Sequence, residues 1–280
     1  MTRRPRRSRQ SNRSQGSIVG DWLQALRGAV TFLTRLPVPR VGSGGGADGA
    51  AATDWDAFRS RPWTIPVVGW LVGSLLGLLV FLTSGLPAPT VTVAYLVGIY
   101  LLTGINHLDG VADLGDAVVV HGDTERRRAV MTDTTAGVGA VLAVVVVIAG
   151  LLMAGLSLAG IPLAVAVAVV IAAEVGAKLG MAAMACFGTA AHDGFGSQLT
   201  SATDPSAFVV PTLLSIPVLA LTWPQPVAGL ALAGGLLGTA LPWWWAHRHL
   251  EGVSGDVFGA ANEIGRILGL HVGVIAWTFW

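Results

Sequence analysis

Three long stretches without a charged residue constrain this chain more than any other feature of its sequence. They cover residues 67–108, 134–173 and 205–246. Each is about 40 residues long, twice the roughly 20 residues that one membrane-spanning helix needs. Each is interrupted near its middle by a segment containing Pro or Gly, and such segments mark turns. Each stretch therefore predicts a hairpin of two transmembrane helices.

The predicted fold is an all-α, polytopic membrane bundle with about six to seven transmembrane helices and an N-terminal interfacial helix. The apolar C-terminal stretch, 267–280, is short for a full span, so whether it crosses the membrane stays open. Only 12% of the residues are charged, about half the share that a soluble domain carries. The predicted spans cover residues 66–83, 90–106, 135–155, 161–187, 207–222 and 227–246.

The N-terminal residues are basic and precede the first span. Residues 1–20 predict a disordered tail, which the positive-inside rule places in the cytoplasm. The tail fits a topology signal better than a nucleic-acid-binding arm, and we expect no nucleic-acid partner. Residues 21–36 have apolar side chains at helical spacing, which predicts the interfacial helix, and 41–52 predict a flexible linker. Residues 21–280 then form a single integral-membrane domain.

On this topology the three charged loops face the cytoplasm together with the tail. They cover residues 107–134, 188–206 and 247–265. A transporter would instead place its acids within the spans, near the middle of the bilayer. We therefore expect one cytoplasmic site built from several loops in the cell membrane. The single Cys186 excludes an intrachain disulfide and a cysteine zinc site.

The segment NHLDGVADLGD (106–116) follows an uncharged span directly. On a helix, Asp109, Asp113 and Asp116 fall within an arc of about 60°. Three carboxylates on one face repel one another unless a cation neutralises them, and hard oxygen ligands suit Mg²⁺. We also expect Gly110 to leave room for a phosphate. The pattern favours metal-assisted transfer of a phosphorus group at the membrane surface.

Other interpretations of these polar residues stay open. The acidic segment could be a solvated helix end, since acids near a helix start favour the helix dipole. Asp133 and Asp256 could be helix caps rather than site residues. His107 could be a general base, a partner of the acids or a histidine that caps a span, and Asn106 a metal ligand or a cap.

Several segments resemble the cobalamin synthase family, whose members are also called adenosylcobinamide-GDP ribazoletransferases. The acidic segment resembles the family's HLDGxAD-x₂-D pattern, and residues 252–266 resemble its G-x-T/S-G-D-x₂-GA-x₂-E pattern. Together these two are specific, and the resemblance covers nearly all of the chain after the tail. The matching segments are FLTRLPVP (32–39), WTIPVVGWLVGSLLG (63–77), HLDGVADLGDAV (107–118), ERRRAVMTDTTAGVGA (125–140) and GVSGDVFGAANEIGR (252–266).

The resemblance implies a membrane transferase that acts late in cobalamin biosynthesis, at nucleotide-loop assembly. A ribose hydroxyl of α-ribazole, or of its 5′-phosphate, attacks the phosphorus next to the cobinamide aminopropanol of adenosylcobinamide-GDP, and GMP leaves. Mg²⁺ is the expected cofactor, and an oligomer is neither required nor excluded. By this resemblance the metal ligands are Asp109, Asp113 and Asp116, the catalytic candidates are Asp109, His107, Asp133 and Asp256, and the substrate-binding candidates are Arg128, Arg127, Asn106 and Glu263.

One departure from the family concerns TAAHDGFG (189–196), where members tend to have an arginine at the position of His192. A phosphate or guanine contact there is therefore in doubt. Two other classes of protein stay as alternatives. The first is another membrane transferase: CDP-alcohol phosphotransferases and prenyltransferases use related aspartate motifs, but their second motif is not evident here. The second is a transporter with acidic gating residues.

Overall fold

The computed structural model describes residues 18–38 and 47–280, and every regular element in this part of the chain is helical. The expected all-α class is therefore confirmed. Of the predicted tail (1–20), residues 1–17 lie outside the described residues. The helices are α1 (Ile18–Leu33), α2 (Ala47–Arg59), α3 (Thr64–Thr83), α4 (Ala88–Thr103), α5 (Asn106–Val119), α6 (Thr124–Met131), α7 (Val138–Leu158), α8 (Leu163–Phe187), α9 (Phe195–Thr200), η1 (Pro205–Phe208), α10 (Val209–Ser215), η2 (Ile216–Ala220), α11 (Val227–His249) and α12 (Gly255–Trp277).

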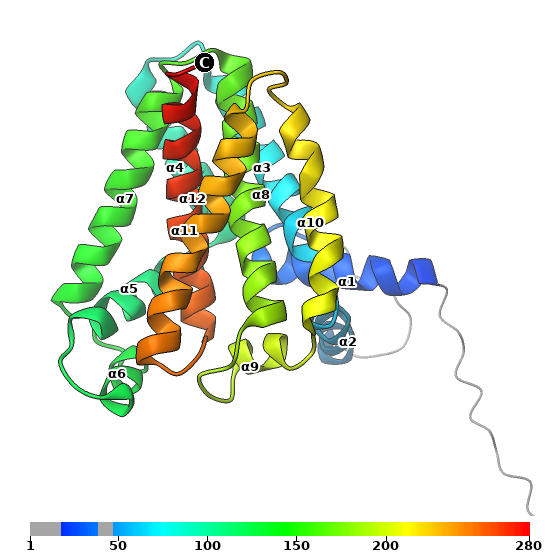
Figure 1. Cartoon of the computed structure of the whole chain (residues 1–280), viewed down its shortest axis with the longest axis vertical. Helices are drawn as coiled ribbons and strands as arrows, with labels where there is room; N and C mark the ends of the chain where they lie inside the picture. The colour runs from blue at the N-terminus through cyan, green and yellow to red at the C-terminus, as the bar shows by residue number, and fades with distance from the viewer. Residues whose placement is uncertain (1–17, 39–46) are drawn as a thin grey trace, which may run out of the picture.

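The long helices α3, α4, α7, α8, α11 and α12 run side by side along the long axis, with α10 beside them (Figure 1). Four described helices are long and apolar enough to cross a membrane, namely α3, α7, α8 and α11, and the bent pair α4–α5 can count as a fifth. The chain is thus a polytopic helical membrane protein, with fewer apolar spans than the six to seven expected. The difference arises at α4, at the broken segment 205–220 and at α12, whose buried polar residues make it less apolar.

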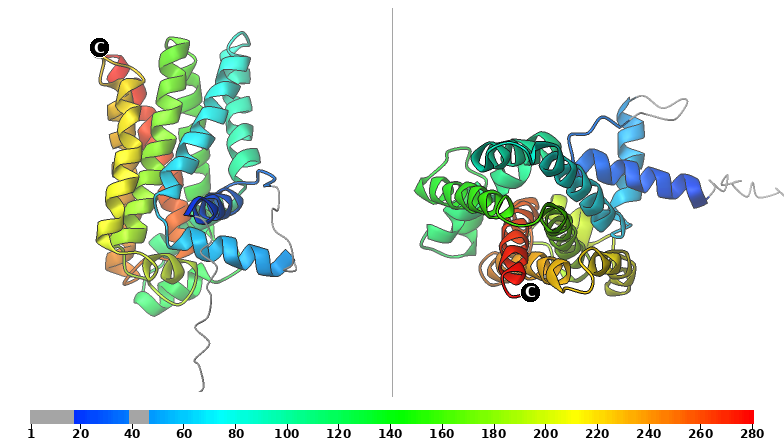
Figure 2. Two further views of the ribbon diagram at one scale, coloured as in Figure 1. Left: turned by 90° about the vertical axis from the view of Figure 1, so that its right-hand side faces the viewer. Right: turned by 90° about the horizontal axis from the view of Figure 1, so that it is seen from above.

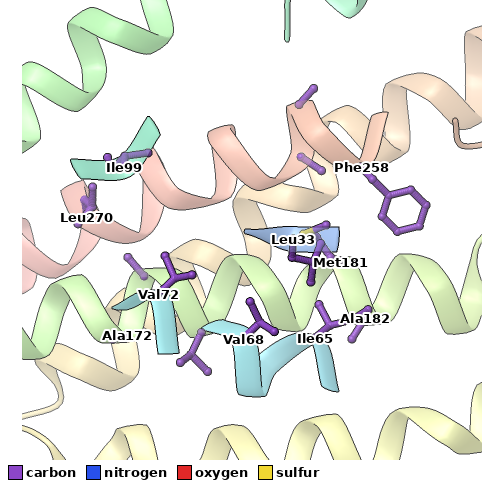
Figure 3. Close-up of a cluster of buried hydrophobic side chains, with 14 of the residues drawn as sticks. Leu33, Ile65, Val68, Val72, Ile99, Ala172, Met181, Ala182, Phe258 and Leu270 are labelled. Carbon is purple, nitrogen blue, oxygen red and sulfur yellow. The ribbon is translucent and has the colours of Figure 1, made fainter. Parts of the chain in front are cut away.

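The centre of the bundle is α8, which packs against α3, α11 and α12. Small residues allow this close packing: a Cβ at Gly69 or Gly73 of α3 would come within about 3 Å of the α8 backbone. Gly77 continues this small-residue face, since a Cβ there would lie 3.0 Å from the Val167 side chain of α8. Around this helix, Val68, Val72 and Met181 form part of the hydrophobic core (Figure 3).

The N-terminal helices lie outside the bundle. Helix α1 crosses the bundle axis rather than following it, and α1 and α2 project sideways (Figure 2). Exposed apolar side chains, including Trp22 and Leu23, fit the predicted interfacial helix. The expected linker over 41–52 is wrong from residue 47 onward, where α2 begins, and its first part lies outside the described residues.

A sharp bend places the acidic segment. Helix α4 ends at Gly104, whose φ of +73° favours glycine, and α5 then turns by 96° from the α4 axis. Helix α5 therefore lies across one end of the bundle, close to α6 and away from the turn between α3 and α4 (Figure 1). The apolar span and the acidic helix are continuous in sequence, but they have different directions in space.

Helix α5 is held in this position by close contact with α12. A Cβ at Gly110 would lie 2.5 Å from the carbonyl oxygen of Asp256, and one at Gly259 would lie 3.0 Å from the Cα of His107. The expectation that Gly110 leaves room for a phosphate is therefore wrong. Its missing side chain makes room for the first turn of α12, which brings Asp256 next to the α5 acids.

Candidate active site

Four carboxylates from two helices gather where α5 crosses the start of α12. Asp109, Asp113 and Asp116 come from α5, as their spacing predicts, and Asp256 comes from the first turn of α12. Burial, and then the charges of Asp256, Asp109 and Asp116, raise the pKa of Asp113 to about 7. No described Lys or Arg forms an ion pair with any of the four. The cluster therefore carries negative charge that no Lys or Arg of the described residues neutralises.

Asp116 differs from the other three because both of its oxygens are already occupied. They accept hydrogen bonds from the backbone N–H groups of Gly137, at 2.6 Å, and Ala140, at 2.9 Å. These groups belong to the first turn of α7, whose N–H groups have no partner within the helix. Asp116 thus caps α7 from a neighbouring helix. Within the described residues, no three His, Cys, Asp or Glu side chains are grouped closely enough to hold a metal ion by themselves.

Three hollows meet at this acid cluster. The inner hollow, of about 220 Å³, is lined by His107, Asp109 and Asp256 and by aromatic side chains. The second, of about 370 Å³, shares Asp256 and adds Arg128. The third, also about 370 Å³, shares Asp109 and contains Asp113. Asp109 and Asp256 each border two hollows, so they lie where ligands in different hollows would meet.

The two predicted phosphate-binding arginines have different surroundings. Arg128 lines the second hollow beside His192, and its guanidinium donates to the carbonyl of Leu250 at 2.6 Å and lies 3.4 Å from Glu251. Arg127 points elsewhere and donates to the carbonyl of Ala117 at 2.5 Å, near the end of α5. Arg128 is thus available at the site, whereas Arg127 satisfies the C-terminal carbonyls of α5.

Asp133 lies in the turn before α7, five residues before the helix begins, and lines the third hollow. Its carboxylate accepts a hydrogen bond from the backbone N–H of Thr135 at 3.0 Å, and this bond lowers its pKa. Asn106 lines the inner hollow, where its amide oxygen accepts from Arg35 at 3.3 Å. The sequence reasoning did not select Arg35, although it belongs to the FLTRLPVP segment.

A buried ionic network lies behind the acid cluster. Arg266 on α12 bonds to Glu174 on α8 and, at 2.5 Å, to Glu263. Lys178 lies 3.7 Å from Glu174, as their spacing predicts, and donates to Asn262 at 2.5 Å. All of these side chains are fully buried. Residues 255–265, expected in a cytoplasmic loop, instead belong to α12, which carries Glu263 into the bundle interior.

This network bears on the transporter alternative, which places acids within the spans. Two buried acids do lie inside the bundle, but two buried cations match them, and none of the three hollows is lined by any of the four. The i,i+4 spacing of Glu174 and Lys178 indicates their pairing, but Arg266 and Asn262 were not among the residues selected from the sequence. A signal was present, because Asn262, Glu263 and Arg266 follow one another at helical spacing in an apolar segment.

His107 connects the buried network to the inner hollow. Lys178 donates to the amide oxygen of Asn262, which turns the Asn262 amide nitrogen toward His107 Nδ1 at 3.1 Å. Nδ1 is therefore the acceptor, and the proton of the neutral ring is on Nε2. Burial, followed by the charges of Lys178 and Arg266, holds the pKa of His107 well below its usual range. The ring is thus a neutral hydrogen-bond donor at the wall of the hollow.

The raised pKa of Asp113 predicts a change of stability with pH. Its pKa rises from 3.8 to about 7 on folding, so the folded protein loses stability as pH rises between these values. In a chelating buffer at pH 8, we expect Asp113→Asn to unfold several degrees above the wild type. The gain should vanish near pH 4. Thermal unfolding in detergent across this pH range measures the difference in stability. A variant less stable than the wild type at pH 8 would contradict the repulsion between Asp113 and the neighbouring carboxylates.

Comparisons with known proteins agree with one another. The sequence model of the family described as cobalamin-5-phosphate synthase matches residues 25–274. A Halorubrum lacusprofundi protein named adenosylcobinamide-GDP ribazoletransferase is 49% identical over 265 residues, covering 91% of this chain and 98% of its own. Two further proteins with the same name also match. The one from Halobacterium salinarum is 52% identical and covers 70% of this chain and 99% of its own length. The one from Methanocella arvoryzae is 35% identical and covers 93% of this chain and 99% of its own length. No solved structure shows a significant match.

Proposed function

The chain belongs to the cobalamin-5-phosphate synthase family, and on that premise we propose that it joins α-ribazole to adenosylcobinamide-GDP, giving adenosylcobalamin and GMP. The observation that carries the proposal is the carboxylate cluster without cationic partners at the junction of three hollows. A reaction between a nucleoside and a nucleotide-bearing substrate needs separate spaces that meet at one point. Asp109 and Asp256 border that point.

In this reaction a ribose hydroxyl oxygen forms a bond to the phosphorus next to the cobinamide aminopropanol. The bond from that phosphorus to the bridging oxygen of the pyrophosphate breaks, and GMP leaves with the oxygen. The hydroxyl proton passes to a carboxylate of the cluster or to solvent, and the candidate is Asp109, which is exposed and borders two hollows. Asp133, at the third hollow, would orient the substrates by hydrogen bonding.

The cluster fits Mg²⁺ because its donors are carboxylate oxygens with uncompensated charge. Asp109, Asp113 and Asp256 have no cationic partner in the part of the chain that the structure describes. Asp116 would contribute through the lone pairs that its bonds to α7 leave. Since no three of these acids converge by themselves, substrate phosphate oxygens would complete the coordination. When bound, the ion would neutralise the pyrophosphate and the charge that develops at phosphorus.

The second hollow suits the departing GMP. Arg128 presents a guanidinium group there, and such groups match phosphate geometry. His192 lies in the same hollow, at the position where the family tends to have arginine. Because Arg128 supplies a cation beside it, the loss of that arginine leaves one positive group in the hollow.

His107 would act as a hydrogen-bond donor rather than as a general base. Glutamine keeps an N–H donor close to the position of Nε2 but cannot take a proton. We therefore expect His107→Gln to keep kcat within about tenfold of the wild type, and His107→Ala to lose about 10²-fold, the scale of one catalytic donor. Steady-state kinetics on both variants distinguish the roles. Equal, large losses would assign His107 as a base.

We place the acid cluster on the cytoplasmic side of the cell membrane by the positive-inside rule. Arg126, Arg127 and Arg128 belong to α6 and Arg248 to the last turn of α11, and both segments lie at the same end of the bundle as α5 (Figure 1). The native Cys186 is buried, which favours a labelling test. In intact cells, a cysteine at Gly85, which has open space around it, should react with an impermeant thiol reagent. A cysteine at the exposed His121 should react only after lysis. The reverse pattern would overturn the orientation.

The proposed function is tested with purified protein in lipid, supplied with adenosylcobinamide-GDP, α-ribazole and Mg²⁺. GMP and the corrinoid product should appear in equal amounts, and chelation should stop both. Undiminished turnover after chelation would reject the requirement for Mg²⁺ but would still support the transferase activity. No product from folded protein would reject the substrates, and CDP-alcohol and prenyl diphosphate substrates would be tested next.

A further inference from the structure

An aromatic wall borders the acid cluster on the side of the N-terminal helices. It consists of Phe32 from α1, Trp55 from α2 and Phe195 from α9. The rings of Phe32 and Phe195 are stacked, with centroids 4.5 Å apart and planes 8° apart, and Trp55 lies 4.9 Å and 5.3 Å from them. The indole N–H of Trp55 donates to Gln198 at 2.8 Å, which fixes the ring. Two consecutive N-terminal helices and the distant α9 thus build one aromatic surface.

The inner hollow brings two rings of this wall together with carboxylates. Phe32 and Phe195 line it, as do Asp109 and Asp256, whereas Trp55 does not. Its remaining surface includes apolar side chains that meet in the core, among them Leu33, Met181 and Phe258 (Figure 3). The lining of the hollow is therefore partly aromatic and apolar and partly acidic. Phe32 is 45% exposed, although a ring that served only the core would be covered.

The size of the hollow limits what it can hold. Pockets for complete drug-sized ligands are usually about 300–1,000 Å³, and this one is about 220 Å³. A corrin macrocycle does not fit such a space, but a fused two-ring base does. Flat aromatic bases bind well by stacking on aromatic side chains.

We propose that the aromatic wall binds the benzimidazole base of α-ribazole, with the ribose hydroxyls directed toward Asp109 and Asp256. This inference rests on the proposed function and adds the acceptor subsite to it. The benzimidazole base has an apolar edge and no N–H donor, which suits a surface of phenyl rings. One ribose then spans from the base to the carboxylates, where the hydroxyl must meet the phosphorus.

The guanine of adenosylcobinamide-GDP, the substrate that donates the phosphorus group, fits this hollow less well. Its base is separated from the attacked phosphorus by a ribose and a second phosphate, so it lies further from the acids than the acceptor base. Guanine also has several hydrogen-bonding groups, which the phenyl rings of Phe32 and Phe195 would leave unpaired. The second hollow, with Arg128, offers the polar contacts that the leaving nucleotide needs.

The test compares Phe195→Leu and Phe32→Leu with the control Phe187→Leu, whose ring contacts Phe208 and lines none of the three hollows. Leucine keeps apolar volume and removes the stacking face. We expect the KM for α-ribazole to rise roughly tenfold in each wall variant, the scale of one base–aromatic stack. The KM for adenosylcobinamide-GDP should stay within twofold, and the control should match the wild type in both. Phe32→Leu changes an exposed side chain, so it serves if Phe195→Leu does not fold.

Any other outcome would contradict the proposed α-ribazole subsite. A raised KM for adenosylcobinamide-GDP with unchanged KM for α-ribazole would assign the wall to the donor. Unchanged values for both would make the wall a packing element. If the wild type turned over neither substrate, the proposed function would fail separately. Equilibrium dialysis with labelled α-ribazole would then decide the subsite, and equal binding by wild type and wall variants, or no binding, would reject it.

Discussion

Asp109→Asn is expected to lower kcat by at least about 10²-fold, the scale of losing one electrostatic contact at a developing charge. Asp109 borders two hollows, is exposed and has no ion pair, so asparagine keeps its shape and removes only its charge. The expected loss is therefore catalytic. Membrane insertion and thermal stability should equal those of the wild type, as measured by fractionation and unfolding in detergent.

Two other aspartates serve as comparisons. Asp56→Asn removes an exposed acid that pairs with Arg59 on α2, and it should leave kcat unchanged. Asp116→Asn removes one of the two acceptor oxygens that cap α7, so it should lower stability as well as activity. Full activity in Asp109→Asn would reject the metal-assisted model. A loss of stability as large as the loss for Asp116→Asn would make Asp109 a structural residue.

Arg266→Met is expected to lower the free energy of unfolding by about 3 kcal/mol or more. The guanidinium group is fully buried and bonds to both Glu174 and Glu263, so its removal leaves two buried carboxylates with Lys178 as their only cation. The network joins α8 to α12, and α12 carries Asp256. The variant should therefore also lose activity, as a consequence of lost structure.

The control for this change is Arg248→Met, which removes an exposed arginine that lies over the Trp244 ring, with its guanidinium carbon 4.8 Å from the ring centroid. That variant should lose well under about 1 kcal/mol. Adding Glu174→Gln to Arg266→Met restores charge balance and should recover part of the stability, which a double-mutant cycle measures. A stable Arg266→Met protein, or no recovery in the double variant, would contradict the electrostatic explanation.

The limits of prediction are clearest at individual residues. Gly110 was expected to admit a phosphate, but it faces the backbone of a helix almost 150 positions later, and no local pattern specifies that neighbour. Asp116 was expected beside a metal, and its additional role as the cap of α7 was not foreseen. Spacing gives the face of a helix on which a residue lies, but not which backbone groups approach that face. The segment FLTRLPVP was recognised as a motif, whereas the contact of its Arg35 with Asn106 depends on the bend at Gly104.

Composition and the helical period are enough to predict which segments form apolar helices and that the acids of α5 lie on one face, because both properties are local. Only the folded structure shows the 96° turn of α5, the addition of Asp256 to its acids, and the burial of Glu263 with Arg266. Each of these depends on contacts between residues distant in the sequence, and such contacts are fixed only when the helices pack together.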